Sequence, residues 1–211
     1  MSRIRTIMCS AVLLLSTTAV PVAAQDGASA RHPQAIVETL HEGLLDIMKK
    51  GPELGFSGRY EVIEPTIKDT FDLRTLAASS IGAAVWSKWD EDQRKAFVDT
   101  FERFLITNYA RQFKSYSGQS FETVGTEPGP KETFIVKTRL LRNEKEPVEL
   151  NYLTRARDGR MGIIDVYANG TSEAGRRRAD FNEIYRQQGF EALLKEIDRL
   201  TADMAKGTEP S

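Results

Sequence analysis

The side chains that most often carry catalysis or bind metals are scarce in this chain. It holds two histidines, His32 and His41, and one cysteine, Cys9. No histidines stand at i and i+4, and the sequence contains no glycine-rich phosphate loop and no calcium-binding loop. We expect His41 to lie on the flank of the first helix as an ordinary polar side chain. The sequence therefore predicts no catalytic residue, no metal site and no cofactor.

One segment has the order of a catalytic serine motif without its partners. Residues 170–174 read Gly-Thr-Ser-Glu-Ala, but the second glycine is missing and both histidines come earlier in the chain. Ser172 is therefore predicted to cap a helix. An enzymatic alternative stays open, an isomerase or hydrolase in which Asp165 or Asp69 works with Tyr152 inside an apolar pocket.

Three consecutive arginines, Arg176, Arg177 and Arg178, form the densest positive run of the predicted helical segments. Such a run is typical of a solvated helix face, and the alternative is contact with an anionic headgroup or an acidic partner. The run lies in the first turns of a predicted helix, where the helix dipole disfavours positive charge. This placement favours the functional interpretation.

Aromatic residues are concentrated between positions 97 and 121. They recur at helical spacing after a helix start at Asp90, which Gln93 completes as a variant of the capping box. A stripe of this kind is typical of a core, but rings packed on a curved sheet also leave apolar space for a ligand. The stripe consists of Phe97, Phe101, Phe104, Leu105, Tyr109, Phe113 and Tyr116.

The ends of the chain differ in composition from the rest. Residues 1–24 join two arginines to an apolar run that ends in small residues, which is typical of a secretory signal peptide. Its removal takes away Arg3, Arg5 and Cys9, and changes the net charge from −1 to −3. A cysteine-free, weakly acidic protein fits the periplasm and does not fit nucleic-acid binding. We expect a flexible segment at 25–32, a single domain at 33–206 and a disordered tail at 207–211.

Hydrophobic periodicity predicts an α+β fold. It changes from a spacing of 3.6 to a spacing of 2 after Gly118, and returns to 3.6 at Ser172. We expect a four-stranded antiparallel sheet covered by N-terminal and C-terminal helices, with an apolar cavity between sheet and helices. The predicted helices span 33–50, which ends at Gly51-Pro52, then 59–70, 72–82, 90–116, 172–187 and 190–205. The predicted strands span 121–124, 133–142, 148–157 and 161–168.

The order and spacing of several short segments resemble the MlaC family of periplasmic phospholipid carriers, also called the toluene-tolerance auxiliary family. These segments include residues 116–121 (Tyr-Ser-Gly-Gln-Ser-Phe) and 165–172 (Asp-Val-Tyr-Ala-Asn-Gly-Thr-Ser). Single positions add to them, among which are Asp72, Gly82, Phe97, Phe101, Leu105, Tyr109, Arg178, Phe181, Gly189 and Leu193. The sequence of residues 115–121 is most similar to the hopanoid-associated branch named HpnM.

The resemblance implies a non-enzymatic carrier that holds the acyl chains of a phospholipid or hopanoid-type lipid and moves it between the outer and inner membranes. The implied partners are an inner-membrane ABC transporter complex and an outer-membrane lipoprotein and porin complex, and a shuttle of this kind is expected to be a monomer. The side chains that we expect to line the lipid cavity are Phe97, Phe101, Phe104, Leu105, Tyr109, Phe113, Phe134, Val136, Leu140, Leu150, Tyr152, Ile164, Val166, Phe181 and Tyr185.

Overall fold

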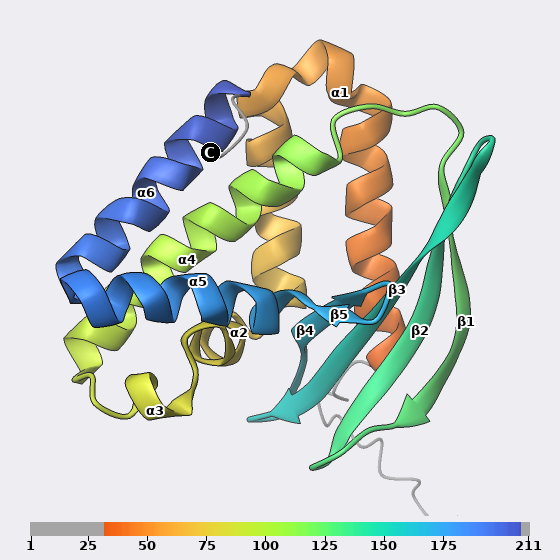
Figure 1. The fold of residues 1–211 in the computed structure, drawn as a ribbon. Helices are drawn as coiled ribbons and strands as arrows, with labels where there is room; N and C mark the ends of the chain where they lie inside the picture. Colours follow the sequence, from red (N-terminus) through yellow and green to blue (C-terminus); the bar gives the residue numbers. More distant parts are fainter. Residues whose placement is uncertain (1–31, 208–211) are drawn as a thin grey trace, which may run out of the picture.

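The computed structural model describes residues 32–207 of the chain (Figure 1). The predicted signal peptide at 1–24, together with residues 25–31 and 208–211, lies outside this part. The helices of the described part are α1 (Pro33–Thr70), α2 (Leu73–Ile81), α3 (Ala83–Trp86), α4 (Glu91–Gln112), α5 (Glu173–Gln188) and α6 (Phe190–Lys206). The prediction that helices precede and follow the strands in the sequence is confirmed.

The sheet is an antiparallel meander of five strands rather than four. Its strands follow the chain order, as β1 (Ser120–Pro128), β2 (Thr133–Arg142), β3 (Lys145–Arg157), β4 (Arg160–Ala168) and β5 (Thr171–Ser172). The prediction missed β5, because a strand of two residues is too short to show alternation. A tight turn at Asn169 and Gly170, both with positive φ, folds β5 back onto the end of β4.

The predicted first strand was too short, since β1 continues through Gly125 to Pro128. Glycine and proline favour a turn, but both are tolerated on an edge strand at a bulge, and the β1–β2 register shifts between Thr123 and Gly125.

Helix α1 lies against the concave side of the sheet, where it contacts β1, β2, β3 and β4, and α4 packs on its other side (Figure 1). Helix α6 packs on α4, and α5 packs on α2. The sheet therefore forms one layer and the helices lie together on one face of it. The apolar face of each strand is buried against α1 or against the helices around it.

Helix α1 is kinked, and the predicted break at Gly51-Pro52 was wrong in position. The backbone departs from helical geometry at Gly55, with φ 61° and ψ −170°. Gly51 instead allows α1 to pass close to the backbone of Lys114, because a Cβ atom at Gly51 would lie 2.3 Å from the carbonyl oxygen of Lys114. Arg59 donates to the carbonyls of Gly51 and Ala110 at 3.0 and 2.9 Å, and so ties the two halves of α1 to the end of α4.

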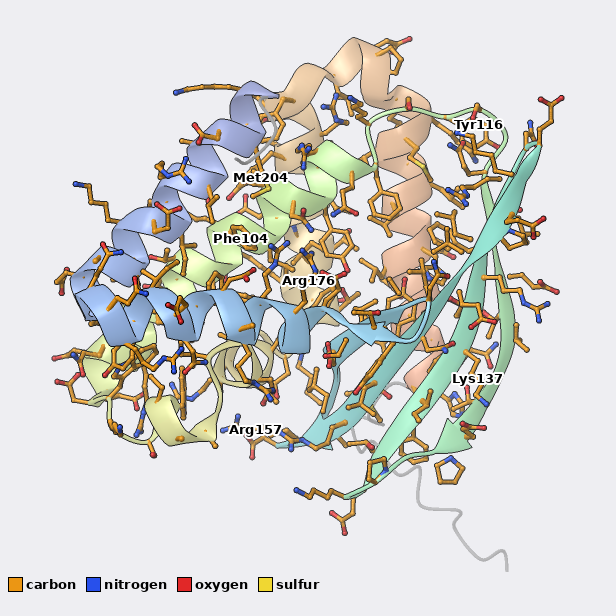
Figure 2. All side chains as sticks on the ribbon, viewed as in Figure 1. Phe104, Tyr116, Lys137, Arg157, Arg176 and Met204 are labelled. Atoms are coloured by element: carbon orange, nitrogen blue, oxygen red, sulfur yellow. The ribbon has the colours of Figure 1, made fainter. Side chains whose placement is uncertain are left out.

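Helix α4 begins as predicted and ends earlier than predicted. Asp90 accepts a hydrogen bond from the backbone N–H of Gln93 at 2.8 Å, and the Gln93 side chain accepts from the backbone of Asp90 at 3.2 Å. The helix ends at Gln112, so Tyr116 lies in the connection to β1, 44% exposed beside Lys49 (Figure 2). The predicted stripe therefore stops short of Tyr116, because the chain turns away to enter the sheet.

Much of the aromatic stripe is core. Phe181 of α5 stands edge-on to Phe97, Phe101 and Phe104 of α4, with ring centroids 6.2 to 6.5 Å apart. Edge-to-face rings at this spacing attract each other beyond their area burial. This contact joins α5 to α4.

Candidate functional site

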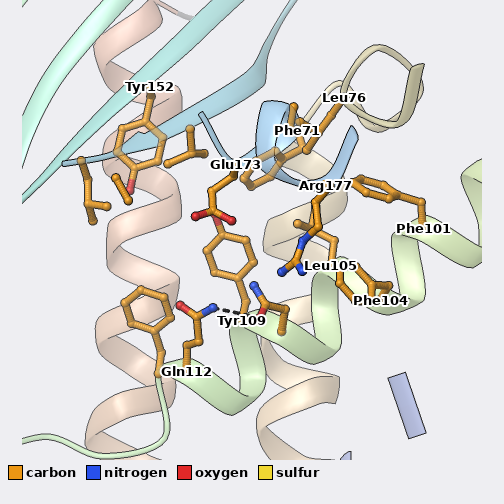
Figure 3. Close-up of a pocket in the computed structure, with 16 residues that line it drawn as sticks. Phe71, Leu76, Phe101, Phe104, Leu105, Tyr109, Gln112, Tyr152, Glu173 and Arg177 are labelled. Atoms are coloured by element: carbon orange, nitrogen blue, oxygen red, sulfur yellow. Dashed lines mark hydrogen bonds between the residues drawn. The ribbon is translucent and has the colours of Figure 1, made fainter. Parts of the chain in front are cut away.

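An apolar cavity of about 100 Å³ lies between helices α2, α4 and α5 and the strands β3 and β4 (Figure 3). Helix α4 supplies one wall, because its residues from Phe101 to Gln112 face α5 and the sheet at helical spacing. The residues that line the cavity are Phe71, Leu76, Phe101, Phe104, Leu105, Asn108, Tyr109, Gln112, Phe113, Leu150, Tyr152, Val166, Ala168, Glu173, Ala174 and Arg177.

The predicted lipid-contacting side chains divide into two sets. The structure brings to the cavity Phe101, Phe104, Leu105, Tyr109, Phe113, Leu150, Tyr152 and Val166. It places outside the lining Phe97, Phe134, Val136, Leu140, Ile164, Phe181 and Tyr185. Alternation along a strand predicts the face of the sheet correctly, but it does not predict which part of that face a helix covers.

The sheet shows how strand position separates the two sets. Val136, Tyr152 and Val166 form one row of paired residues across β2, β3 and β4, but Val136 lies away from the cavity, fully buried on β2. Phe134 and Leu140 lie toward opposite ends of β2, where Phe134 is 38% exposed and Leu140 is half-buried.

The other predicted residues outside the cavity lining lie in different environments. Ile164 is the bulge residue between Ile163 and Asp165, and it has no partner on β3. Phe97 and Phe181 belong to the ring cluster between α4 and α5, and Tyr185 packs edge-on against Trp89 at 5.6 Å.

Sequence reasoning missed several lining residues, which are Phe71, Leu76, Asn108, Gln112, Ala168, Glu173 and Ala174. Phe71 precedes the helix cap Asp72, and Ala174 follows the cap Ser172, so a position next to a helix start was the available signal for these two. Asn108 directly precedes Tyr109 of the aromatic stripe, and Gln112 directly precedes Phe113. No pattern in the sequence distinguished the polar lining residues from surface residues.

Four polar side chains, Asn108, Gln112, Glu173 and Arg177, form what we call the polar rim of the cavity. Gln112 is exposed and the other three are half-buried, whereas Tyr152 is 1% exposed. The polar rim therefore marks the mouth and Tyr152 marks the closed end. Gln112 donates from Nε2 to Oδ1 of Asn108 at 2.8 Å (Figure 3).

The three consecutive arginines point in different directions, as neighbours on a helix must. Arg177 lines the cavity, with its guanidinium 4.7 Å from the ring centroid of Phe104. Arg176 is exposed and pairs with Glu173 at 2.8 Å, and Arg178 is exposed and donates to the carbonyl of Ser79 at 2.9 Å. Burial, followed by the charge of Arg176, lowers the pKa of Arg177.

Tyr109 lies between the polar rim and the closed end, and Glu173 and Arg177 are directed toward it (Figure 3). Burial of its hydroxyl raises the pKa of Tyr109, and the nearby Glu173 carboxylate raises it further. Tyr109 therefore stays neutral over the physiological range, between the charged side chains of Glu173 and Arg177.

At the closed end of the cavity, Tyr152 contacts α1 through the side chain of His41. The prediction that His41 lies on the flank of the helix was wrong, since its side chain is 4% exposed and stacks on Phe121 with ring centroids 3.9 Å apart. Its Nε2 atom lies 3.0 Å from the Tyr152 hydroxyl. Burial lowers the pKa of His41 from 6.5 to about 3, so this imidazole is neutral at pH 7.

Asp165 and Asp69, the carboxylates considered for an enzyme, lie outside the cavity lining. The two carboxylate oxygens of Asp165 accept hydrogen bonds from the backbone of Val166 and Ala174 and from the Ser172 hydroxyl, at 2.5 to 3.2 Å. Ser172 caps α5 as predicted, since its Oγ accepts from the backbone N–H of Gly175 at 2.8 Å. These groups hold the β4–β5–α5 corner together.

Comparison with known proteins identifies the family. The family model described as MlaC protein matches residues 38–199, which is most of the chain. The chain belongs to the MlaC family. The resemblance found in the sequence is thereby confirmed at the level of the family, and the HpnM branch stays a prediction.

A solved structure shares the fold. It is the phospholipid-binding protein from Ralstonia solanacearum, determined in complex with a phospholipid. The two chains superpose with a TM-score of 0.72 at 20% identity, over 83% of this chain and 99% of the other. No curated protein matches the chain. Among residues 32–207, no helix has the length and apolar character to cross a bilayer.

Proposed function

We propose that this protein is a lipid carrier that shelters acyl chains in the cavity and holds the headgroup at the polar rim. The observation that carries the proposal is the polarity gradient of the cavity, from the exposed Gln112 at the mouth to rings and aliphatic side chains farther in. Pockets that combine an apolar wall with a few polar groups are suited to amphiphiles. Membership of the MlaC family and the fold shared with a phospholipid-binding protein support it.

The size of the cavity implies that it opens when it is loaded. Its volume of about 100 Å³ is below the roughly 300 Å³ at which ligand pockets begin. Loading therefore requires that α5 and α4 separate from β3 and β4. The faces that would separate are largely apolar. A lipid acyl chain can therefore replace the contacts between their side chains without leaving buried charges unpaired.

The free energies involved suit a carrier. Removing a chain of about sixteen carbons from a bilayer costs roughly 12 kcal/mol, at about 0.8 kcal/mol per methylene. An apolar cleft recovers most of this cost, and binding stays reversible because no covalent or metal bond is involved. A carrier has to bind the acyl chain with a free energy close to that of the membrane, so that it can both extract the lipid and release it.

We further propose that the protein works in the periplasm after removal of residues 1–24, as a monomer that exchanges lipid between an outer-membrane complex and an inner-membrane ABC transporter. The cargo is a phospholipid or a hopanoid-type lipid. These assignments rest on family membership and on the predicted signal peptide.

The test is to purify the protein from the periplasm of its own host without detergent and to extract bound lipid for mass spectrometry. We expect about one lipid per protein, and a large excess of one lipid class over its share in the membrane. A protein that is folded by circular dichroism and yields no stoichiometric lipid would contradict the carrier function.

A further inference from the structure

A second hollow, about 590 Å³ in volume, lies outside the cavity and is bordered by α2, α3, β3 and α5. We call it the arginine groove, because four arginines line it, which are Arg74, Arg155, Arg157 and Arg178. Arg157 lies at the end of β3 (Figure 2). None of the residues that line the groove in the described part of the chain is acidic. The walls of the arginine groove therefore carry charge of one sign.

Two of these arginines already have an anion. Arg74 donates both ends of its guanidinium to the carboxylate of Glu91, at 2.7 and 3.0 Å. Arg157 lies 3.4 Å from Asp158, whose side chain is 90% exposed. An exposed pair of this kind is weak. Arg74 is thus neutralised by a partner on α4, whereas Arg157 keeps most of its capacity to attract an anion.

The other two arginines contact α2 one turn apart. Arg155 donates to the hydroxyl of Thr75 at 3.1 Å, and Arg178 donates from Nε to the carbonyl of Ser79 at 2.9 Å. Because Thr75 and Ser79 are four residues apart, these contacts lie about 6 Å apart along the axis of α2. Within residues 32–207, no ion pair joins Arg155 or Arg178 to a carboxylate. Each guanidinium has five N–H donors, so both have donors left for an anion.

The arginine groove also offers apolar surface. Trp86 of α3 is half-buried, with its ring between the guanidinium groups of Arg74 and Arg94 at 5.4 and 5.7 Å. Ala78 and Ala83 line the groove beside it. A small inorganic anion makes no apolar contact, and a flat membrane surface does not enter a concave groove. A protein segment can place both charged and apolar side chains there.

We propose that the arginine groove binds an acidic segment of a partner protein, with carboxylates on Arg155 and Arg178 and an apolar side chain on Trp86. Side chains on one side of an extended segment repeat about every 6.5 Å, close to the spacing of the two arginine contacts. A guanidinium binds a carboxylate through two parallel hydrogen bonds. Helix α2 separates the groove from the cavity, since Leu76 lines the cavity and Thr75 lines the groove. The proposal therefore goes beyond lipid binding and does not depend on it.

The test measures binding of a labelled twelve-residue peptide of alternating glutamate and serine to the full chain without its signal peptide, by fluorescence polarisation. We expect it to bind roughly tenfold or more tightly than the same peptide with glutamine for glutamate, and to weaken as salt is added. Arg155→Gln combined with Arg178→Gln should weaken binding by roughly tenfold. Arg139→Gln combined with Arg186→Gln is the matched control, because it removes the same charge from exposed, ion-paired sites outside the groove.

A second pair of variants leaves every arginine in place. Ala83→Glu adds a negative charge at the groove, whereas Ala84→Glu adds the same charge at the next exposed position, which does not line it. We expect Ala83→Glu to weaken peptide binding by roughly fivefold and Ala84→Glu to leave it within twofold. Both positions are exposed, so neither change is expected to unfold the protein.

Three results would overturn the proposal. Equal binding of the glutamate and glutamine peptides would show that the groove does not recognise carboxylates. Equal loss in the test and control variants would show that only net charge matters. Tighter binding of inorganic phosphate, or of phosphatidylglycerol vesicles, than of the glutamate peptide through the same two arginines would assign the groove to a small anion or to a membrane.

Discussion

The Nε2 atom of His41 lies 3.0 Å from the hydroxyl oxygen of Tyr152, and this contact joins the first helix of the domain to the middle of its sheet. The two rings also meet edge to face, with centroids 5.3 Å apart. Tyr152 lines the closed end of the cavity, so a buried histidine supports the wall that the cargo is proposed to touch. A neutral imidazole makes this support dependent on pH.

We predict that the protein loses stability below neutral pH through His41. Burial lowers its pKa from 6.5 in the unfolded chain to about 3, so below pH 6.5 the unfolded state takes up a proton that the folded state does not. The loss begins as pH falls through 6.5 and continues to about 3. At pH 5 this histidine alone lowers the free energy of unfolding by about 2 kcal/mol relative to pH 7.

Urea denaturation at the two pH values measures this effect, and His41→Gln isolates it. Glutamine retains a hydrogen-bonding group for Tyr152 but has no titration in this range. The pH 7 to pH 5 difference should shrink by about 2 kcal/mol in the variant. An unchanged difference would show that His41 is protonated in the folded protein.

We predict that Asp165→Ala destabilises the fold by about 2 to 4 kcal/mol, because it leaves buried N–H donors at the start of α5 without acceptors. Thermal or urea unfolding measures the loss. Asp99→Ala is the control, since Asp99 is half-exposed and makes only a surface pair with Lys95, so we expect about 0.5 kcal/mol or less. Equal effects of the two variants would contradict the role assigned to Asp165.

We predict that Gly51→Ala is destabilising by about 2 kcal/mol or more, because its Cβ would lie 2.3 Å from the Lys114 carbonyl oxygen and force the kinked helix away from the end of α4. Gly125→Ala serves as the control. Gly125 has ordinary backbone angles, and nothing lies within 4 Å of a Cβ there. Chemical denaturation of both variants should separate them, and a harmless Gly51→Ala would disprove the close approach.

We predict that Ala168→Trp prevents lipid loading without unfolding the protein. Ala168 lines the cavity from β4, and a tryptophan there occupies the space that the first methylenes of a chain need. Ala156→Trp is the matched control, since Ala156 is an exposed strand residue outside the lining. The readout is lipid per protein by mass spectrometry, and normal loading of Ala168→Trp would place the cargo elsewhere.

Local pattern determined much about this protein. The change of period after Gly118 predicts helices followed by an antiparallel sheet, and the Asp90 and Ser172 caps predict two helix starts that the structure contains. The order of short segments predicts the MlaC family, to which the chain belongs. These features depend on neighbours in the chain, and hydrogen bonding and side-chain spacing act over a few residues.

Only the tertiary structure decided which rings border the cavity and which are core. Phe97 and Phe104 share one stripe and both contact Phe181, yet only Phe104 lines the cavity, because Trp86 and Trp89 also pack against Phe97. The inward aim of Arg177 and the burial of His41 against Tyr152 also depend on segments that are far apart in the chain. Periodicity specifies the direction of a side chain from its own element, and the partner it meets depends on how those elements pack.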